Sequence, residues 1–186
     1  MKGAVARRLL TRDDFHRLGE AGILNEDDRV ELLNGELIEM SPIGPRHAAA
    51  VRRLDRLFNR RLGKLAIVSV QNPVALGEHS EPQPDLTILR PRADDYGMEH
   101  PAPRDIFLLV EVMDSSRDFD RGEKLRSYAR AGIQEVWLLD LAGDLLEVHR
   151  QPASTRYRSA AQFKRGQRIQ IAALPGKWFR VAEILG

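Results

Sequence analysis

The 186-residue sequence predicts an α/β (α+β) fold in which helices flank a mixed central β-sheet. Apolar runs of strand length, above all Ile106 to Val112, are interspersed with amphipathic stretches of helical period, above all Arg46 to Leu62. Their mixed order along the chain is hairpin, helix, strands, helix, strands. We expect a single domain over residues 1–186, with a core at 11–150 and a C-terminal strand extension at 151–186.

The N-terminal part predicts a short helix followed by a β-hairpin. Thr11 and Asp14 have the spacing of a capping box, and glycines bound the short helix that follows. Asn34-Gly35 lies between two apolar-containing runs. This dipeptide is the strongest short signal for a tight hairpin turn, because its residues tolerate positive φ angles.

Residues 46–62 predict a helix with an apolar stripe and a basic remainder. The stripe consists of Val51, Leu54, Leu57, Phe58 and Leu62, and Gly63 ends the helix. The range 46–64 holds seven basic residues and one acid, so this helix is a candidate for binding phosphates. A solvated basic surface is the alternative, and charge alone favours it. The candidate nucleic-acid contacts are Arg46, Arg52, Arg53, Arg56 and Arg60.

The middle of the chain predicts three strands. Leu65 to Gln71 is an apolar, β-branched run that ends before Pro73, and Pro84 to Arg90 forms a second strand. Ile106 to Val112 is interrupted only by Glu111, which is typical of a strand buried on both faces.

The C-terminal half predicts a helix, a hairpin and two weaker strands. The helix covers 120–131, ends at Gly132, and is expected to be preceded by a cap or turn at Ser115-Ser116. The hairpin joins 135–140 to 145–150 around Gly143, and the weaker strands cover 169–174 and 178–184.

Composition excludes several classes of protein. The chain has no cysteine, which excludes a disulfide framework, a thiol nucleophile and a zinc ribbon. Its longest purely apolar stretch is far too short to cross a membrane, and the basic first ten residues lack an apolar signal core. We therefore expect a cytoplasmic protein that has no membrane partner.

Two carboxylates lie at strand ends, where they could form a metal-binding site. Asp85 begins one predicted strand and Glu111 lies near the end of the next, so antiparallel pairing would make them neighbours at one edge of the sheet. Two adjacent anions in a partly dry site repel each other, and an oxygen-preferring cation such as Mg²⁺ would compensate them. Each also has a simpler explanation, since Asp85 could be a turn residue and Glu111 could lie where the strand emerges into solvent.

Lys124 is a third candidate, at the margin of the apolar stripe formed by Leu125 and Tyr128. From there it could reach the sheet edge and stabilise negative charge that develops on a phosphate. An ion pair with Asp120 one helical turn away is the alternative. We expect Tyr128 and Trp137 to be core aromatic residues.

The ordered set of motifs resembles the Uma-two family of restriction-endonuclease-like proteins, within the PD-(D/E)XK nuclease superfamily. The match rests on Pro84-Asp85, Glu111-Val112, Asp120-x-x-x-Lys124-x-x-x-Tyr128, and Glu135-Val-Trp-Leu-Leu-Asp140. The opening motifs Glu31-Leu-Leu-Asn-Gly-Glu36 and Met40-Ser-Pro, with His47, resemble the same family.

The resemblance implies phosphodiester hydrolysis with one or two Mg²⁺ (or Mn²⁺) ions. It makes Asp85 and Glu111 the metal ligands and Glu31 a secondary acidic candidate, with His47 a further one. The superfamily's usual lysine would fall at position 113, which is Met113 here, and the resemblance implies that Lys124 replaces it. Glu31 could instead be an exposed strand residue, and His47 a cap or surface residue.

The sequence is thus compatible with three functions. The first is a metal-dependent endonuclease acting on DNA, for which a twofold homodimer would suit cleavage of both strands. The second is a non-catalytic nucleic-acid-binding or assembly module that retains the nuclease fold, which Met113 favours. The third is an unrelated α/β protein whose acids lie on the surface and bind no metal.

Overall fold

A six-stranded mixed sheet forms the centre of the computed structural model, which describes residues 7–25, 27–114 and 117–186. The strand order is β3-β4-β5-β6-β7-β8, and every pair is antiparallel except the parallel pair β5–β6. The predicted mixed sheet with flanking helices is thereby confirmed. The strands are β3 (Ile67–Val70), β4 (Leu86–Leu89), β5 (Ile106–Met113), β6 (Glu135–Asp140), β7 (Leu145–Ala153) and β8 (Arg156–Phe163).

Strands β5 and β6 are buried along their whole length, as the continuous apolar run in β5 predicts. A parallel pair needs a crossover connection, because the chain must return to the same end of the sheet. The crossover is helical: α3 (Arg117–Phe119), a π-helical segment (Asp120–Lys124) and α4 (Leu125–Ala131). The predicted helix at 120–131 therefore exists, but its first turn is a π-helix. The proposed cap at Ser115-Ser116 lies outside the described residues.

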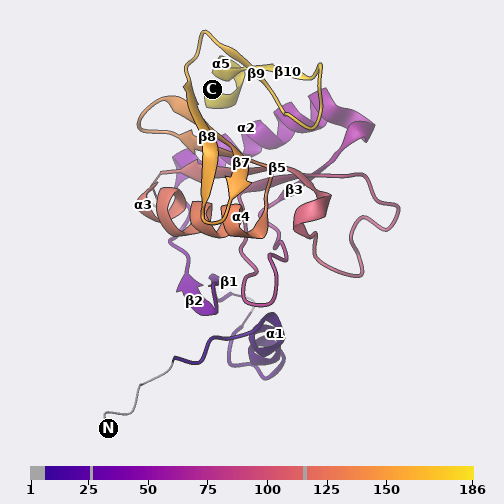
Figure 1. Cartoon of the computed structure of the whole chain (residues 1–186), viewed down its shortest axis with the longest axis vertical. Helices are drawn as coiled ribbons and strands as arrows, with labels where there is room; N and C mark the ends of the chain where they lie inside the picture. Colours follow the sequence, from indigo (N-terminus) through magenta and orange to yellow (C-terminus); the bar gives the residue numbers. More distant parts are fainter. Residues whose placement is uncertain (1–6, 26, 115–116) are drawn as a thin grey trace.

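Helices cover both faces of the sheet (Figure 1). Helix α2 (Pro45–Leu62) packs its apolar stripe on one face together with α5 (Val181–Leu185), around Phe58, Trp137 and Phe179. Helix α4 covers the other face, where Tyr128 packs near Met113 and Leu138. Trp137 and Tyr128 are completely buried.

The N-terminal elements lie beside this sandwich. Helix α1 (Arg12–Glu20) begins with the predicted capping box between Thr11 and Asp14. Strands β1 (Val30–Leu33) and β2 (Glu36–Glu39) form the predicted hairpin, and its two turn residues, Asn34 and Gly35, have φ angles of 53° and 81°.

The C-terminal segment differs from the prediction in three places. The strand predicted at 169–174 is only β9 (Arg168–Gln170). Strand β8 was not predicted, because most of its side chains are exposed and its apolar residues do not alternate regularly with polar ones. Residues 178–184 are not one strand. Only β10 (Trp178–Arg180), which pairs with β9 (Arg168–Gln170), is extended, and the chain then turns into α5. The apolar residues Val181, Ile184 and Leu185 have helical spacing and are buried against α2.

Within the described parts of the chain, no helix combines the length and the apolar character that a transmembrane segment needs.

Candidate active site

A cleft of about 730 Å³ opens where strand β4 begins and strand β5 ends. The β1–β2 hairpin, the start of α2 and the π-helical segment form its walls. Among the described residues, its lining holds far more acids than bases, since the basic ones are Arg29, His47 and Lys124. The acids are Asp28, Glu31, Glu39, Asp85, Glu111, Asp114 and Asp120.

Asp85 and Glu111 are neighbours in the antiparallel register. Leu86 pairs with Val110, so the residue before Leu86 lies beside the residue after Val110. Asp85 Oδ2 accepts a hydrogen bond of 2.8 Å from the backbone N–H of Val112, which follows Glu111. The predicted juxtaposition of the two carboxylates at one edge of the sheet is therefore present.

Glu111 is 2% exposed, and burial raises its pKa to about 8. The positive charge of Lys124 opposes this rise, while the negative charges of Asp120 and Asp85 add to it. The hydroxyl of Tyr128 donates a hydrogen bond to Glu111 Oε1. Glu111 therefore does not lie where the strand emerges into solvent.

Lys124 points into the cleft and holds two acids together. Its Nζ lies 3.2 Å from Glu31 Oε1 and 3.4 Å from Glu111 Oε1, and the residue is 7% exposed. Burial by itself would lower the pKa of Lys124, but the charges of Glu111 and Glu31 outweigh burial and raise that pKa. Lys124 is thus a permanent cation, and it cannot serve as a general base near neutral pH.

The two secondary candidates also lie in the cleft. Glu31 is 1% exposed, and its Oε2 accepts a hydrogen bond of 3.0 Å from the backbone N–H of Gln83. His47, in the first turn of α2, places Nε2 2.8 Å from Asp85 Oδ1, and this hydrogen bond raises the pKa of His47. Neither residue therefore occupies a plain surface position.

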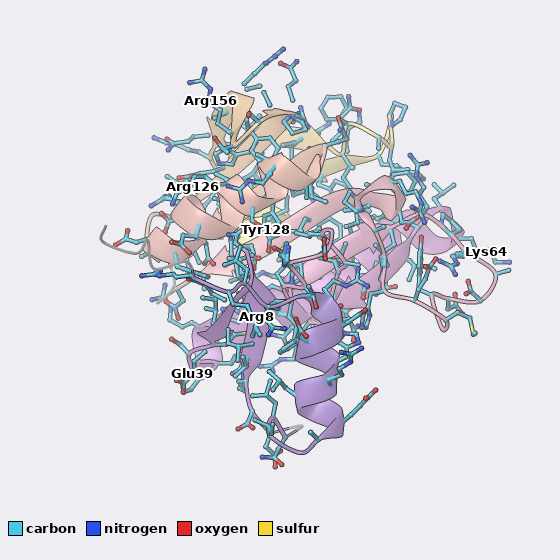
Figure 2. The ribbon with its side chains drawn as sticks, turned by 60° about the horizontal axis from the view of Figure 1, so that its bottom comes forward. Arg8, Glu39, Lys64, Arg126, Tyr128 and Arg156 are labelled. Atoms are coloured by element: carbon cyan, nitrogen blue, oxygen red, sulfur yellow. The ribbon has the colours of Figure 1, made fainter. Side chains whose placement is uncertain are left out.

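The arginines proposed for nucleic-acid contact do not line the cleft. Arg52, Arg56 and Arg60 are exposed along α2, at distances that grow from about 10 Å to about 22 Å from its first residue. Arg46 donates to the carbonyl of Leu141, and Arg53 donates to carbonyls at the end of α5. Figure 2 shows Lys64, just beyond α2, on the opposite side of the molecule from Glu39 at the cleft.

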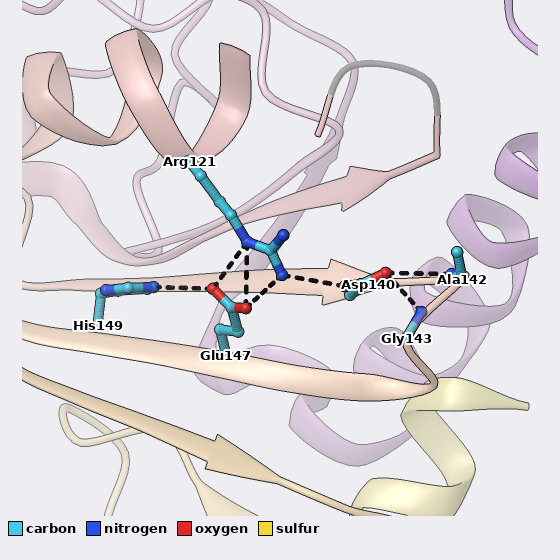
Figure 3. A network of polar contacts seen from close by, with 6 residues as sticks. All are labelled: Arg121, Asp140, Ala142, Gly143, Glu147 and His149. Carbon is cyan, nitrogen blue, oxygen red and sulfur yellow. Dashed lines mark hydrogen bonds and ion pairs between the residues drawn. The ribbon is translucent and has the colours of Figure 1, made fainter. Parts of the chain in front are cut away.

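An ion-pair network fixes the π-helical segment that carries Lys124 (Figure 3). Arg121 donates to Asp140 Oδ2 over 3.0 Å and to both carboxylate oxygens of Glu147. The other oxygen of Asp140 caps the turn by accepting from the backbone N–H groups of Ala142 and Gly143. A π-helical turn is uncommon and recurs at functional sites, and here it sets the direction of Lys124.

The donor set of the cleft suits a hard divalent cation. Four buried carboxylates, Asp85, Glu111, Glu31 and Asp120, surround one lysine. Within the described part of the chain, Glu31 Oε1 is buried with no hydrogen-bond partner beyond its ion pair with that lysine. Oxygen ligands of this kind are those that Mg²⁺ prefers. The residues present therefore fit the metal that the sequence predicts.

Comparison with known proteins identifies the family. The sequence profile of the family described as "Uma2: Putative restriction endonuclease" matches residues 12–182, which is most of the chain. The chain belongs to the Uma2 family. A search of curated proteins finds no match. Among solved structures, the Uma2 chain resembles "a putative nuclease belonging to DUF820" from Anabaena variabilis ATCC 29413, with 15% identity and a TM-score of 0.74. The alignment covers 95% of this chain and 97% of that one, and it shows a shared fold.

The sequence analysis of this Uma2 chain overlooked several residues that line the cleft or bond to its acids. Asp120 was considered only as a partner for Lys124, yet it is 3% exposed and lines the cleft. Tyr128 is a core residue whose hydroxyl reaches Glu111. Gln71 has a positive φ and donates to Asp85 over 3.4 Å. The four-residue spacing of Asp120, Lys124 and Tyr128 was the available signal, since it places all three on one helix face.

Proposed function

We propose that this Uma2 protein is a metal-dependent endonuclease that hydrolyses phosphodiester bonds of DNA. The observation that carries the proposal is the convergence of Asp85, Glu111 and Lys124 in one acidic cleft. Buried acids that outnumber their cations are costly unless a cation joins them. The description of the family as restriction endonucleases is the reason for naming DNA as the substrate.

Asp85 and Glu111 would hold Mg²⁺ or Mn²⁺, with Glu31 and Asp120 as further carboxylates of the same cleft. When bound, such a metal supplies a Lewis acid for the phosphate and an activated water. His47 and the backbone N–H of Val112 hold the two oxygens of Asp85, so the carboxylate has one fixed orientation. Second partners of this kind orient metal ligands and strengthen binding.

Lys124 would act on the phosphate as a fixed positive charge. Its Nζ is held between Glu31 and Glu111, so little reorganisation is needed when charge develops on a phosphate oxygen nearby. Because the lysine stays protonated, it stabilises charge and does not take a proton from water.

The beginning of α2 adds a second feature suited to phosphate. Gly44 and His47 line the cleft, and no side chain of a described residue caps the first turn of this 18-residue helix. Backbone N–H groups at a helix N-terminus and the helix dipole favour an anion. A phosphate in the cleft would thus meet Lys124 from one wall and the start of α2 from another.

The main argument for a non-catalytic nucleic-acid-binding module was the missing lysine at position 113, and this argument is weakened. Met113 favoured that function because it removes the usual lysine from β5. Met113 is buried in the apolar layer under α4, and Lys124, from the adjoining π-helical segment, reaches Glu111 instead. A cationic group therefore accompanies the two acids, which supports catalysis over binding alone.

The test is cleavage of supercoiled plasmid DNA with Mg²⁺ or Mn²⁺, and with structured RNA as a parallel substrate. We expect nicking by the wild type, and a loss of about 100-fold or more in Asp85→Asn, Glu111→Gln and Lys124→Met. Glu123→Gln is the matched control for the acids, because Glu123 is an exposed neighbour of Lys124 on the same segment. Lys64→Met is the matched control for the lysine.

Circular dichroism verifies that each variant is folded. Salt-sensitive DNA binding by the wild type without cleavage would favour the binding module. Full cleavage by Lys124→Met would refute the role of the lysine but retain the nuclease. Size-exclusion chromatography with and without DNA tests the proposed homodimer.

A further inference from the structure

A second cluster of metal-ligating side chains lies outside the cleft. It consists of His16 from α1, Glu81 from the connection between β3 and β4, and His100 from the loop before β5. One ligand atom from each residue lies within 4.8 Å of the others. None of these residues lines the cleft, so the cluster is separate from the proposed active site.

Glu81 is the fixed centre of this cluster. The residue is 3% exposed, and its backbone N–H donates to the carbonyl of Leu32 over 2.8 Å, in an isolated bridge to β1. Its Oε2 lies 3.2 Å from Arg12 Nε, but both atoms are buried without a hydrogen-bond partner. Arg12 thus balances the charge at one oxygen, and Oε1 is the oxygen that faces the two imidazoles.

The two histidines approach Glu81 Oε1 from different segments. His16 Nε2 lies 2.7 Å from this oxygen, and His100 Nε2 lies 3.9 Å from it. The rings are arranged edge to face, with centroids 6.3 Å apart. Both side chains are close to half exposed, so an ion has direct access from solvent.

Helix α1 has little else to hold it in place. None of its nine residues is buried, and Figure 1 shows it set apart from the central sheet. Polar contacts tie it to the protein: Arg12 forms an ion pair with Glu81 and donates its backbone N–H to the carbonyl of Glu78, and His16 contacts Glu81. An ion shared by α1 and two loops would therefore add a cross-link where apolar packing is sparse.

We propose that His16, Glu81 and His100 bind a zinc ion that fastens α1 to the loops beside the sheet. Two imidazole nitrogens and one carboxylate oxygen form a ligand set typical of Zn²⁺, with a fourth position left for water. The cleft, in contrast, offers mainly carboxylate oxygens, which suit Mg²⁺. The two sites therefore differ in the metal they select.

The test uses the full chain, stripped with a chelator, and Zn²⁺ alone as the probe. The background is the Asp85→Asn/Glu111→Gln double variant, which removes the two principal cleft ligands and keeps the result independent of nuclease activity. Isothermal titration should show one equivalent of Zn²⁺ that a large excess of Mg²⁺ does not displace. His16→Ala and His100→Ala should each weaken binding about tenfold or more, whereas His79→Gln, a nearby histidine outside the cluster, should not.

Hydrogen exchange supplies a second readout, because nonspecific binding of Zn²⁺ to the protein surface would not change exchange in α1. In the Asp85→Asn/Glu111→Gln background, Zn²⁺ should slow amide exchange in residues 12–20. When His16→Ala is added to this background, Zn²⁺ should leave that exchange unchanged. Absence of Zn²⁺ binding in the double variant would overturn the site. An affinity for Zn²⁺ in His16→Ala and His100→Ala that equals that of the double variant would also overturn the site. Unchanged amide exchange in α1 would overturn the proposal that zinc fastens this helix.

Discussion

Metal binding by the cleft should depend steeply on pH, because Glu111 must lose a proton before it can ligate. Burial raises the pKa of Glu111 to about 8 in the metal-free protein. The carboxylate is then mostly protonated below about pH 8 and mostly ionised above it. Apparent affinity for Mn²⁺ or Mg²⁺ should therefore rise about tenfold per pH unit from pH 6 to 8 and level off above pH 9.

The assay is isothermal titration with Mn²⁺ across this range, repeated in two buffers of different ionisation enthalpy so that released protons are counted. About one proton should leave per ion bound at pH 7 in the wild type. Glu111→Gln should bind more weakly and lose most of the pH dependence. An affinity that is flat from pH 6 to 8, or a slope that persists in Glu111→Gln, would refute the reasoning.

His47 requires its own control in this experiment. Its hydrogen bond to Asp85 raises the pKa of His47 above its ordinary value, so the titration of His47 is a second source of pH dependence. A protonated His47 beside Asp85 would also repel a cation. His47→Gln should keep most of the slope if Glu111 is its source. Lys124 and Tyr128 do not contribute, because both have a raised pKa and keep their protons throughout.

Three further predictions concern stability and the placement of Lys124. Tyr128→Phe removes the hydroxyl bonded to Glu111 Oε1, leaves that buried oxygen to its 3.4 Å ion pair with Lys124, and should lower the free energy of unfolding by about 1–3 kcal/mol in urea titrations. Phe58→Ala removes a fully buried ring between α2 and the sheet and should cost about 3–5 kcal/mol by the same measurement, so a loss below 1 kcal/mol would contradict the described packing. Arg121→Gln should reduce DNA cleavage more than metal affinity, since Arg121 anchors the turn that directs Lys124 and touches no proposed metal ligand. Equal losses in both would argue against that positioning role.

The sequence determined the elements whose signals are local. The Asn34-Gly35 turn needs only two residues that accept positive φ, and the stripe of α2 needs only helical spacing. The neighbourhood of Asp85 and Glu111 also followed from the sequence, because two strand ends and one assumption of antiparallel pairing place them together. These features depend on residues close in the chain or on one simple pairing.

The tertiary structure determined which segments that are distant in the sequence come into contact. The β1–β2 hairpin brings Glu31 to Lys124, and the start of α2 brings His47 to Asp85, across separations that no local pattern encodes. Arg121, in the π-helical turn, reaches acids in β6 and β7, and helical period alone could not reveal these contacts. Strand β8 forms although its sequence lacks apolar alternation, because its pairing with β7 supplies the hydrogen bonds. Burial and charge at the site arise only when these segments pack together, and that packing is what turns scattered acids into one cleft.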